Sequence, residues 1–481
     1  MRAVAYPDSA LRLAATWLVV AGVALLSGAT ASGEVDARFG ETPALLLLAA
    51  LLGGTFFVLI AYLGSLAIVV WPVAATVGYL IQVPRGQPPV ITFDRVWIGG
   101  MLVYIALNRR GSERSAYTKP LAFGLLWFVV AYGLRSVTTS ATLGGPVATW
   151  VDAILLPAIL FVACERYCLL GADRGRRLTG ALMLAGGVLG AIGVAQRIWG
   201  FELATLTGGG VRFDTVVDQT RVSGPYPVPE PYGLSLVVCL AATLYWIQSR
   251  PRGSRYGWAL VLAGLEIAGI MLTLFRAAWI AAVLVIVASF GIRPGRFGRL
   301  YAVMGLVAVV AVVAAPQLLQ NETIATRTQD TDNIDARLAT YEQGFQIFRS
   351  APIFGVGVNE YNAVAEQLPP ETVGGVESLT FAHSSYVGLL AEQGILGFLP
   401  LLVVSYGVWV LVRGLRTASF SSREALFLTG AVAGAALGYL IMSLTLTMLP
   451  YGPSNAFFAA FLGAASGRLD ALLSAAQRRA P

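Results

Sequence analysis

The sequence predicts an all-α, polytopic membrane protein. Of its 481 residues, 57% are hydrophobic and 12% are charged, and the mean hydropathy is +0.72. Because soluble domains carry about 25% charged residues, a single water-soluble core and a disordered chain are both excluded. Apolar runs of about 20 residues, the length that crosses a bilayer as a helix, recur along the chain. Runs such as 43–63 lack the two-residue alternation of a membrane β-barrel.

We expect about fourteen apolar spans, of which twelve to fourteen cross the membrane as helices. The fourth and fourteenth spans are the weakest, and either could be a half-helix or an interfacial segment. The first span ends in small residues, as a cleaved signal peptide would. Its apolar stretch is long for a signal peptide, so we interpret it as an uncleaved anchor. The spans are 11–30, 43–61, 64–82, 92–108, 119–137, 147–168, 177–196, 231–247, 256–274, 277–292, 299–316, 387–412, 424–445 and 454–469.

The basic residues indicate the direction of the spans, because cytoplasmic loops are rich in Lys and Arg. A cytoplasmic N-terminus followed by alternation places 22 of the 33 basic residues in cytoplasmic loops and termini. Every such loop except the hairpin near Gly64 then holds at least three. The rest are all Arg and lie in or near outer loops, where topology does not require them: Arg38, Arg85, Arg95, Arg135, Arg197, Arg212, Arg221, Arg276, Arg327, Arg337 and Arg349.

Two outer segments are long, and the larger is the only one with room for structure of its own. We divide the chain into N-terminal transmembrane helices (1–175), central helices with an outer loop at about 197–230 (176–316), a large extracytoplasmic loop (317–386) and C-terminal helices (387–481). No Walker loop or dinucleotide fingerprint is visible, so no ATP or NAD is expected. The net charge of +7 follows the topology and predicts no nucleic-acid partner.

A helix is predicted in the large loop, capped by Asp332 or Asn333 and ended by Pro352 just beyond Ser350. Viewed down the helix axis, Arg337 projects about 20° from Phe348, which places it at the edge of the apolar side of this helix. Its side chain should therefore point toward the membrane domain. It could be a snorkelling side chain with its stem on apolar surface, or an anion ligand at the membrane surface. Three- and four-residue spacing predicts one apolar stripe on this helix, made of Ile334, Leu338, Tyr341, Phe345 and Phe348.

Arg276 is the only charged residue in a nearly apolar connection between the ninth and tenth spans. It lies at the N-terminus of the tenth span, whose dipole and free N–H groups favour an anion. Its guanidinium could be an interfacial anchor, or it could bind a diphosphate in a bidentate fork.

His383 is the only histidine in the chain and lies immediately before the twelfth span. Ser384 or Ser385 can cap that helix. Histidine has an ordinary pKa of about 6.5, which suits proton transfer near neutrality. One histidine cannot form a metal site alone. His383 is therefore either a polar residue without a catalytic role or a general base.

Other polar and titratable residues carry weaker signals. The stretch from Asp330 to Asp335 resembles a cation loop but lacks the glycine and distal glutamate of an EF-hand. Glu266 and Glu392 fall within or near spans. A carboxyl group there either has a function or forms a bond with a neighbouring side chain, which for Glu392 could be an arginine. The three cysteines lie in or beside apolar helices and predict neither a disulfide framework nor a zinc site.

Four stretches in order resemble the O-antigen ligase and O-antigen polymerase superfamily of bacterial membrane glycosyltransferases, over roughly residues 175–470. The last motif is the most specific, because it joins a histidine to an E-x-G-x-x-G helix. The stretches are Arg221-Val222-Ser223-Gly224-Pro225-Tyr226, Leu274-Phe275-Arg276-Ala277-Ala278-Trp279, Pro352-Ile353-Phe354-Gly355-Val356-Gly357, and His383-Ser384-Ser385-Tyr386-Val387 with Glu392-Gln393-Gly394-Ile395-Leu396-Gly397.

The resemblance implies an all-helical fold of the C type of membrane glycosyltransferase, located in the bacterial inner membrane. It implies an inverting transfer from a polyprenyl-diphosphate-linked glycan to an acceptor hydroxyl on the outer face, without metal or nucleotide cofactor. The acceptor is a further lipid-linked glycan for a polymerase, slightly favoured, or the lipid A core for a ligase. By matching motif, Arg276 and Arg337 bind the diphosphate, Arg221 is a further candidate for this role, and His383 activates the hydroxyl. Ser384, Tyr386 and Glu392 are candidates for a supporting role.

Two other functions are compatible with a polytopic chain. A lipid-linked glycan flippase or transporter needs charged or broken helices at the bilayer midplane and paired halves. The charges here gather toward one face, and no repeat between the halves is visible. A scaffold for envelope assembly needs no catalytic residue, so it predicts that His383 is dispensable.

Overall fold

The computed structural model describes residues 62–79, 92–107, 114–139, 145–199, 221–250, 256–291 and 332–478, together with Gly54 and Ile60. The spans expected at 11–30 and 299–316, and almost all of the one at 43–61, lie outside these residues. So do the start of the Asp330 stretch and part of each long outer loop.

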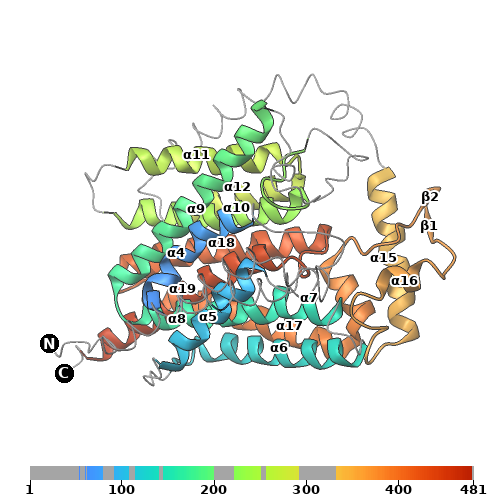
Figure 1. Cartoon of the computed structure of the whole chain (residues 1–481), viewed down its shortest axis with the longest axis horizontal. Helices are drawn as coiled ribbons and strands as arrows, with labels where there is room; N and C mark the ends of the chain where they lie inside the picture. The colour runs from blue at the N-terminus through green and yellow to red at the C-terminus, as the bar shows by residue number, and fades with distance from the viewer. Residues whose placement is uncertain are drawn as a thin grey trace, which may run out of the picture.

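The described residues form an α-helical bundle with one two-stranded hairpin (Figure 1). Every expected span within the described residues is observed as a helix. The helices are α4 (Ser65–Gly78), α5 (Phe93–Leu107), α6 (Lys119–Thr139), α7 (Pro146–Trp150), the π-helix η1 (Val151–Leu155), α8 (Leu156–Leu169), α9 (Ala172–Trp199), α10 (Pro229–Ser249), α11 (Gly257–Leu272), α12 (Arg276–Gly291), α15 (Asp332–Ser350), α16 (Tyr361–Ala365), α17 (Ser385–Ala418), α18 (Arg423–Thr445) and α19 (Gly452–Gln477).

Seven helices in the described part of the chain are long and apolar enough to cross a membrane. The protein is therefore an all-α polytopic membrane protein, as the composition predicts. The fourteenth expected span is no half-helix, because α19 is 26 residues long and belongs to this set. The fourth expected span is a helix of 15 residues, α5, which is shorter than a full membrane crossing.

Small residues let neighbouring helices approach closely. Gly434 of α18 faces the backbone of Val285 on α12, and Gly438 faces Ala281. Gly467 and Gly463 of α19 lie against the backbone of α8 in the same way. Lipid tails are as apolar as leucine, so membrane helices associate through such close contacts rather than through hydrophobic burial.

The helix order places the loops alternately at two ends of the bundle. The loops rich in arginine, around 114–119, 166–177 and 413–423, meet at one end, which we call the basic end. Figure 1 shows α15, α16 and the hairpin at the opposite side of the molecule from the last turns of α19. We call that opposite end, which carries residue 383, the His383 end. This segregation follows the alternation expected from the charges.

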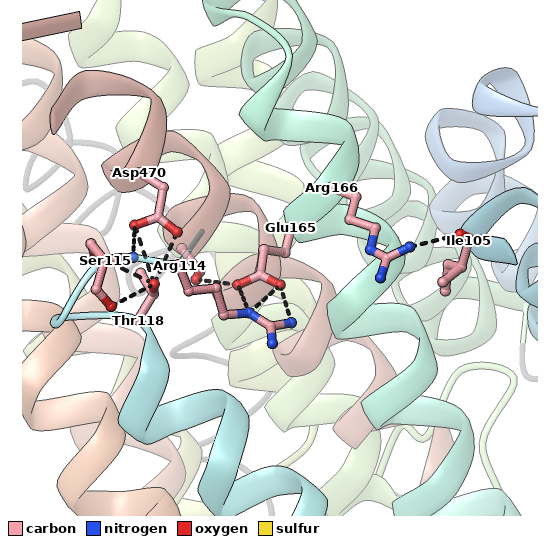
Figure 2. A network of polar contacts seen from close by, with 8 residues as sticks. Ile105, Arg114, Ser115, Thr118, Glu165, Arg166 and Asp470 are labelled. Atoms are coloured by element: carbon pink, nitrogen blue, oxygen red, sulfur yellow. Dashed lines mark hydrogen bonds and ion pairs between the residues drawn. The ribbon is translucent and has the colours of Figure 1, made fainter. Parts of the chain in front are cut away.

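A buried polar network ties helices together at the basic end (Figure 2). Arg114 donates from Nε and Nη2 to the Glu165 carboxylate at 2.6–3.0 Å, and Ser466 donates to the same carboxylate at 2.9 Å. Asp470 of α19 accepts from the Thr118 hydroxyl at 2.9 Å. These bonds connect the start of α6 with α8 and α19, so residues far apart in sequence share one core.

The large loop carries α15, α16 and the antiparallel strands β1 (Thr372–Val373) and β2 (Val376–Glu377). Helix α15 runs from Asp332 to Ser350. Its end agrees with the stop predicted from Pro352, and its start lies within one or two residues of the one expected from a cap at Asp332 or Asn333. The predicted apolar stripe is wrong at two positions, because Leu338 is 48% exposed and Phe345 is 40% exposed. The buried face instead contains mostly small and polar side chains, because α17, α16 and the hairpin cover that face: Ala339, Thr340, Gln343, Gly344 and Ile347.

Helix α17 is interrupted near its start. Gly394 has φ 61° and ψ −164°, which is outside the helical region and joins two helical segments across a kink. A side chain at this position would be strained, because L residues rarely adopt such a φ. The first segment runs from Ser385 to the kink and holds the side chains nearest His383.

Candidate active site

His383 lies in the short connection that leads into α17. Ser384 is the N-cap of this helix, and its hydroxyl accepts from the Tyr386 N–H at 3.3 Å. The Phe381 ring lies beside the imidazole, with 4.5 Å between ring centroids. Both imidazole nitrogens are buried without a hydrogen-bond partner in the part of the chain that is described. A buried polar atom of this kind is a place where a substrate group can bind.

Arg337 of α15 acts electrostatically on His383. Burial, and then the positive charge of Arg337, lower the pKa of His383 to about 4. The imidazole is therefore neutral near pH 7 and able to accept a proton. On α15, Tyr341 is one turn from Arg337, and its hydroxyl donates to the Leu444 carbonyl at 2.5 Å. Arg337 thus faces the membrane helices, as the sequence predicts.

The connection between α18 and α19 fixes the residues around His383. The Ser385 hydroxyl donates to the Leu446 carbonyl at 3.1 Å and accepts from the Met448 N–H at 2.7 Å. Thr447 donates to the Ala382 carbonyl. The sequence motifs did not indicate residues 446–453, although Pro450, Gly452 and Pro453 in this segment are residues typical of a turn.

Arg276 is the first residue of α12 and lies at the His383 end. Helices α12 and α18 run antiparallel, because Ala281 lies opposite Gly438 and Val285 lies opposite Gly434. The same register puts Arg276 level with Ser443, whose carbonyl accepts from the Ser384 hydroxyl at 3.4 Å. The Arg276 side chain is exposed. The preceding Leu274 has φ 51°, so the turn that presents Arg276 has an uncommon backbone conformation.

The Arg221 side chain binds other parts of the protein. Its Nη2 donates to Glu230 at 2.8 Å, and the two side chains are 18% and 10% exposed. Its Nε donates to the Thr273 carbonyl at 3.0 Å, and the Val222 N–H donates to the Leu272 carbonyl at 3.1 Å. Arg221 therefore supports the turn before Arg276, and the neighbouring carboxylate already neutralises much of its charge.

The four motifs form two joints at the same end of the bundle. The Arg221 motif binds the turn of the Arg276 motif through the contacts given above. The 352–357 motif binds the Glu392 motif through backbone hydrogen bonds, including Val356 N–H to the Ala391 carbonyl at 3.0 Å and Ile395 N–H to the Pro352 carbonyl at 2.9 Å. Within the described residues, the Glu392 carboxylate forms no ion pair with an arginine and accepts a hydrogen bond from the Tyr361 N–H at 3.5 Å.

An apolar groove between α17, α18 and α19 begins close to His383. Its empty space is about 520 Å³, including its open part. The Tyr386 hydroxyl at its start donates to the Leu440 carbonyl at 3.3 Å. The groove extends along α17 to Val408, and its wall consists of Tyr386, Leu401, Val404, Ser405, Val408, Ala436, Tyr439, Leu440, Ser443, Leu449 and Phe458.

Within the described residues, no group of three or more His, Cys, Asp or Glu side chains could hold a metal ion. Glu266 is fully buried and accepts from the Thr243 hydroxyl at 2.8 Å. It lies on α11 among helices α9 and α10, away from the His383 end.

Fold and site together define a multi-pass α-helical membrane protein with a histidine and arginines at one end of its helices. Residues 258–402 match the protein family described as O-antigen ligase. The match includes Arg276, Arg337, His383 and Glu392 but not Arg221, and no curated protein matches the chain. This segment of the chain, which covers α11, α12, α15, α16 and the first half of α17, is therefore similar to the O-antigen ligase family, in agreement with the resemblance of its motifs.

Proposed function

We propose that the protein is an inverting glycosyltransferase of surface or exopolysaccharide assembly. The donor is a glycan linked to a polyprenyl diphosphate, and the acceptor is a sugar hydroxyl on the outer face of the inner membrane. Polymerisation of lipid-linked repeats is the favoured reaction, with transfer to the lipid A core as the alternative. The observation that carries this proposal is the buried, neutral His383 within the electrostatic reach of Arg337, three residues before Tyr386, which lines an apolar groove.

In the proposed reaction, a His383 ring nitrogen removes the proton from the acceptor hydroxyl. The hydroxyl oxygen attacks the anomeric carbon of the donor sugar from the side opposite the diphosphate. The bond between that carbon and the diphosphate oxygen breaks, and the polyprenyl diphosphate leaves with the electron pair. A single displacement of this kind inverts the anomeric configuration.

The leaving diphosphate needs charge neutralisation rather than a proton, because it is already a weak base. Arg337 and Arg276 supply fixed positive charge, which is most effective in a site of low dielectric. We assign Arg221 to holding the turn that presents Arg276, since its guanidinium already binds Glu230 and the Thr273 carbonyl. The apolar groove next to Tyr386 offers a place for the first isoprene units of the donor.

Surface glycans from a deletion strain test the reaction. If glycans are restored by the wild-type gene but not by a His383→Ala variant that is present in the membrane at normal amounts, a transferase is supported. Loss of chain length indicates a polymerase, and loss of attachment to lipid A indicates a ligase. Normal glycans in the His383→Ala strain would remove the assignment of the base.

A transporter makes a different prediction for the same strain. If the protein moved lipid-linked glycans across the membrane, the deletion would trap unpolymerised donor on the cytoplasmic face. A transferase leaves the donor on the outer face, where an added glycosidase that cannot cross the membrane cleaves it. Accumulation of protected donor would therefore favour transport over transfer.

A further inference from the structure

The break in α17 is filled by another part of the chain. Residues 352–357, which follow α15, lie against the kink at Gly394. Gly355 fits there because a Cβ atom would collide with the backbone of Glu392, and Gly394 fits because a Cβ atom would collide with the Ile353 carbonyl. Both glycines also have positive φ, of 68° and 61°.

Backbone hydrogen bonds close both sides of the break. Before the kink, the carbonyls of Ala391 and Glu392 accept from the N–H groups of Val356 and Gly357, at 3.0 and 2.8 Å. After the kink, the N–H groups of Ile395 and Leu396 donate to the carbonyls of Pro352 and Ile353, at 2.9 and 3.2 Å. Interrupted membrane helices often expose such groups to ions or substrates. Here the protein itself satisfies these groups, so the break is a joint rather than an ion site.

The Glu392 side chain extends this joint to the loop helices. Its carboxylate accepts from the backbone N–H of Tyr361, at the start of α16, at 3.5 Å. The Tyr361 hydroxyl in turn donates to the Thr340 carbonyl of α15 at 3.2 Å. Thr340 lies one helical turn from Arg337. A continuous chain of contacts therefore runs from α17 to the arginine that faces His383.

Two further contacts hold the same parts. Arg135 of α6 donates from Nη2 to the Gly355 carbonyl at 2.7 Å. The Gln343 amide of α15 donates to the Ala365 carbonyl of α16 at 3.2 Å. Helix α15 also packs directly on α17, where Gly344 faces the Val387 side chain, so the contacts through α16 and Tyr341 add to this packing in orienting α15.

We propose that Glu392 is a positioning residue for Arg337. It acts by accepting a hydrogen bond from the Tyr361 backbone, which fixes α16 and, through the Tyr361 hydroxyl, fixes α15 so that Arg337 stays beside His383. Arg135 supports the same joint from α6. The role requires a hydrogen-bond acceptor at residue 392 and not a negative charge. The catalytic part of this inference rests on the proposed function.

Two substitutions of Glu392 distinguish the effect of its hydrogen-bond acceptor from the effect of its negative charge. Glu392→Gln keeps an oxygen acceptor, whereas Glu392→Ala removes it. Donor-dependent transfer is measured with purified protein in nanodiscs. We expect Glu392→Ala to lower kcat about 10- to 100-fold, because a misplacement of about 1 Å has such effects, and Glu392→Gln to restore most of the rate. Tyr361→Phe, which removes only the hydroxyl, is expected to fall between them.

A spin label tests the joint without any assay of transfer. The label is attached at Glu342→Cys on the exposed face of α15, with a second sample labelled at Phe420→Cys near the basic end as control; the native cysteines at 164, 168 and 239 are buried. We expect Glu392→Ala and Tyr361→Phe to increase the mobility of the α15 label only. Immobile labels in both variants would overturn the proposal, and so would a Glu392→Gln variant as impaired as Glu392→Ala. Inactive wild-type protein would count against the proposed function, while the label would still decide the role of Glu392.

Discussion

At the residue scale, the protonation of His383 depends on its surroundings more than on the imidazole itself. Burial and Arg337 both disfavour the imidazolium, so the pKa of His383 is about 4 in the free protein. A base with so low a pKa is always available at neutral pH but accepts a proton weakly. A bound diphosphate would offset the charge of Arg337, and we therefore expect donor binding to raise the pKa of His383.

We predict that His383→Ala lowers transfer about 10²- to 10⁴-fold, the usual contribution of a general base. Initial rates with saturating donor, measured at equal amounts of folded protein, check this. Ser422→Ala is a suitable control, because it removes a helix cap of α18 at the basic end, where the Ser422 hydroxyl accepts from the Ala425 N–H at 3.3 Å. It should cost about 1 kcal/mol of stability and no catalysis. A His383→Ala variant as active as this control would exclude the base.

The pH profile gives a second prediction. Because the base must be unprotonated, kcat/KM should fall as the pH drops through the pKa of His383, about 4 in the wild type. Arg337→Gln removes the neighbouring charge but leaves the burial, so the acid limb should move upward while remaining below about 6.5. An acid limb that stays in place would show that Arg337 does not act on the imidazole.

At the element scale, α17 combines a capped start next to His383 with a structural joint at its kink. Its first turn is fixed by Ser384 and Ser385, and its break receives the 352–357 segment. The break occurs near the His383 end, where the membrane helices meet the loop. The interruption thus lets one membrane helix bind both the loop and its neighbours.

We predict that Gly394→Ala destabilises the protein, because an L residue at φ 61° is strained by about 1–3 kcal/mol and its Cβ would meet the Ile353 carbonyl. Gly375→Ala is a matched control, since that glycine also has positive φ, of 85°, but has open space around it. Thermal unfolding in detergent should show a larger drop for Gly394→Ala. Equal drops would mean that the packed joint adds nothing to the backbone strain.

The polar network at the basic end makes a separate prediction. Glu165→Ala leaves the donors of Arg114 and Ser466 without their acceptor, which should cost about 1–3 kcal/mol. Asp173→Ala breaks an exposed pair with Arg176 and should cost about 0–1 kcal/mol. Unfolding midpoints compare the two variants. A smaller effect for Glu165→Ala than for Asp173→Ala would contradict a structural role for this network.

At the scale of the whole molecule, the described arginine-rich loops and the candidate site lie at opposite ends of the helix bundle. The described basic loops gather at one end, and the histidine, Arg337 and Arg276 lie at the other. The positive-inside rule then predicts that the His383 end faces away from the cytoplasm. This orientation would give the site access to lipid-linked glycans on the outer surface.

Labelling of single cysteines checks the orientation. We expect Asn362→Cys, on the exposed face of α16, to react with a membrane-impermeant maleimide in spheroplasts. Phe420→Cys, at a residue that is 91% exposed at the basic end, should react only after the membrane is permeabilised. The opposite pattern would place the site in the cytoplasm and reject the proposed reaction.

The sequence by itself determined the helical class, the span positions within the described residues and the bounds of α15, because bilayer thickness and helix capping act locally on composition and spacing. It also selected His383 and Arg276 from their places at helix starts, and Arg337 from its angular position beside Phe348 on α15. Only the tertiary structure decided that Leu338 and Phe345 are exposed, that Arg221 pairs with Glu230, and that the 352–357 motif fills the break in α17. These outcomes depend on which distant segments pack together, and no local pattern of residues encodes that choice.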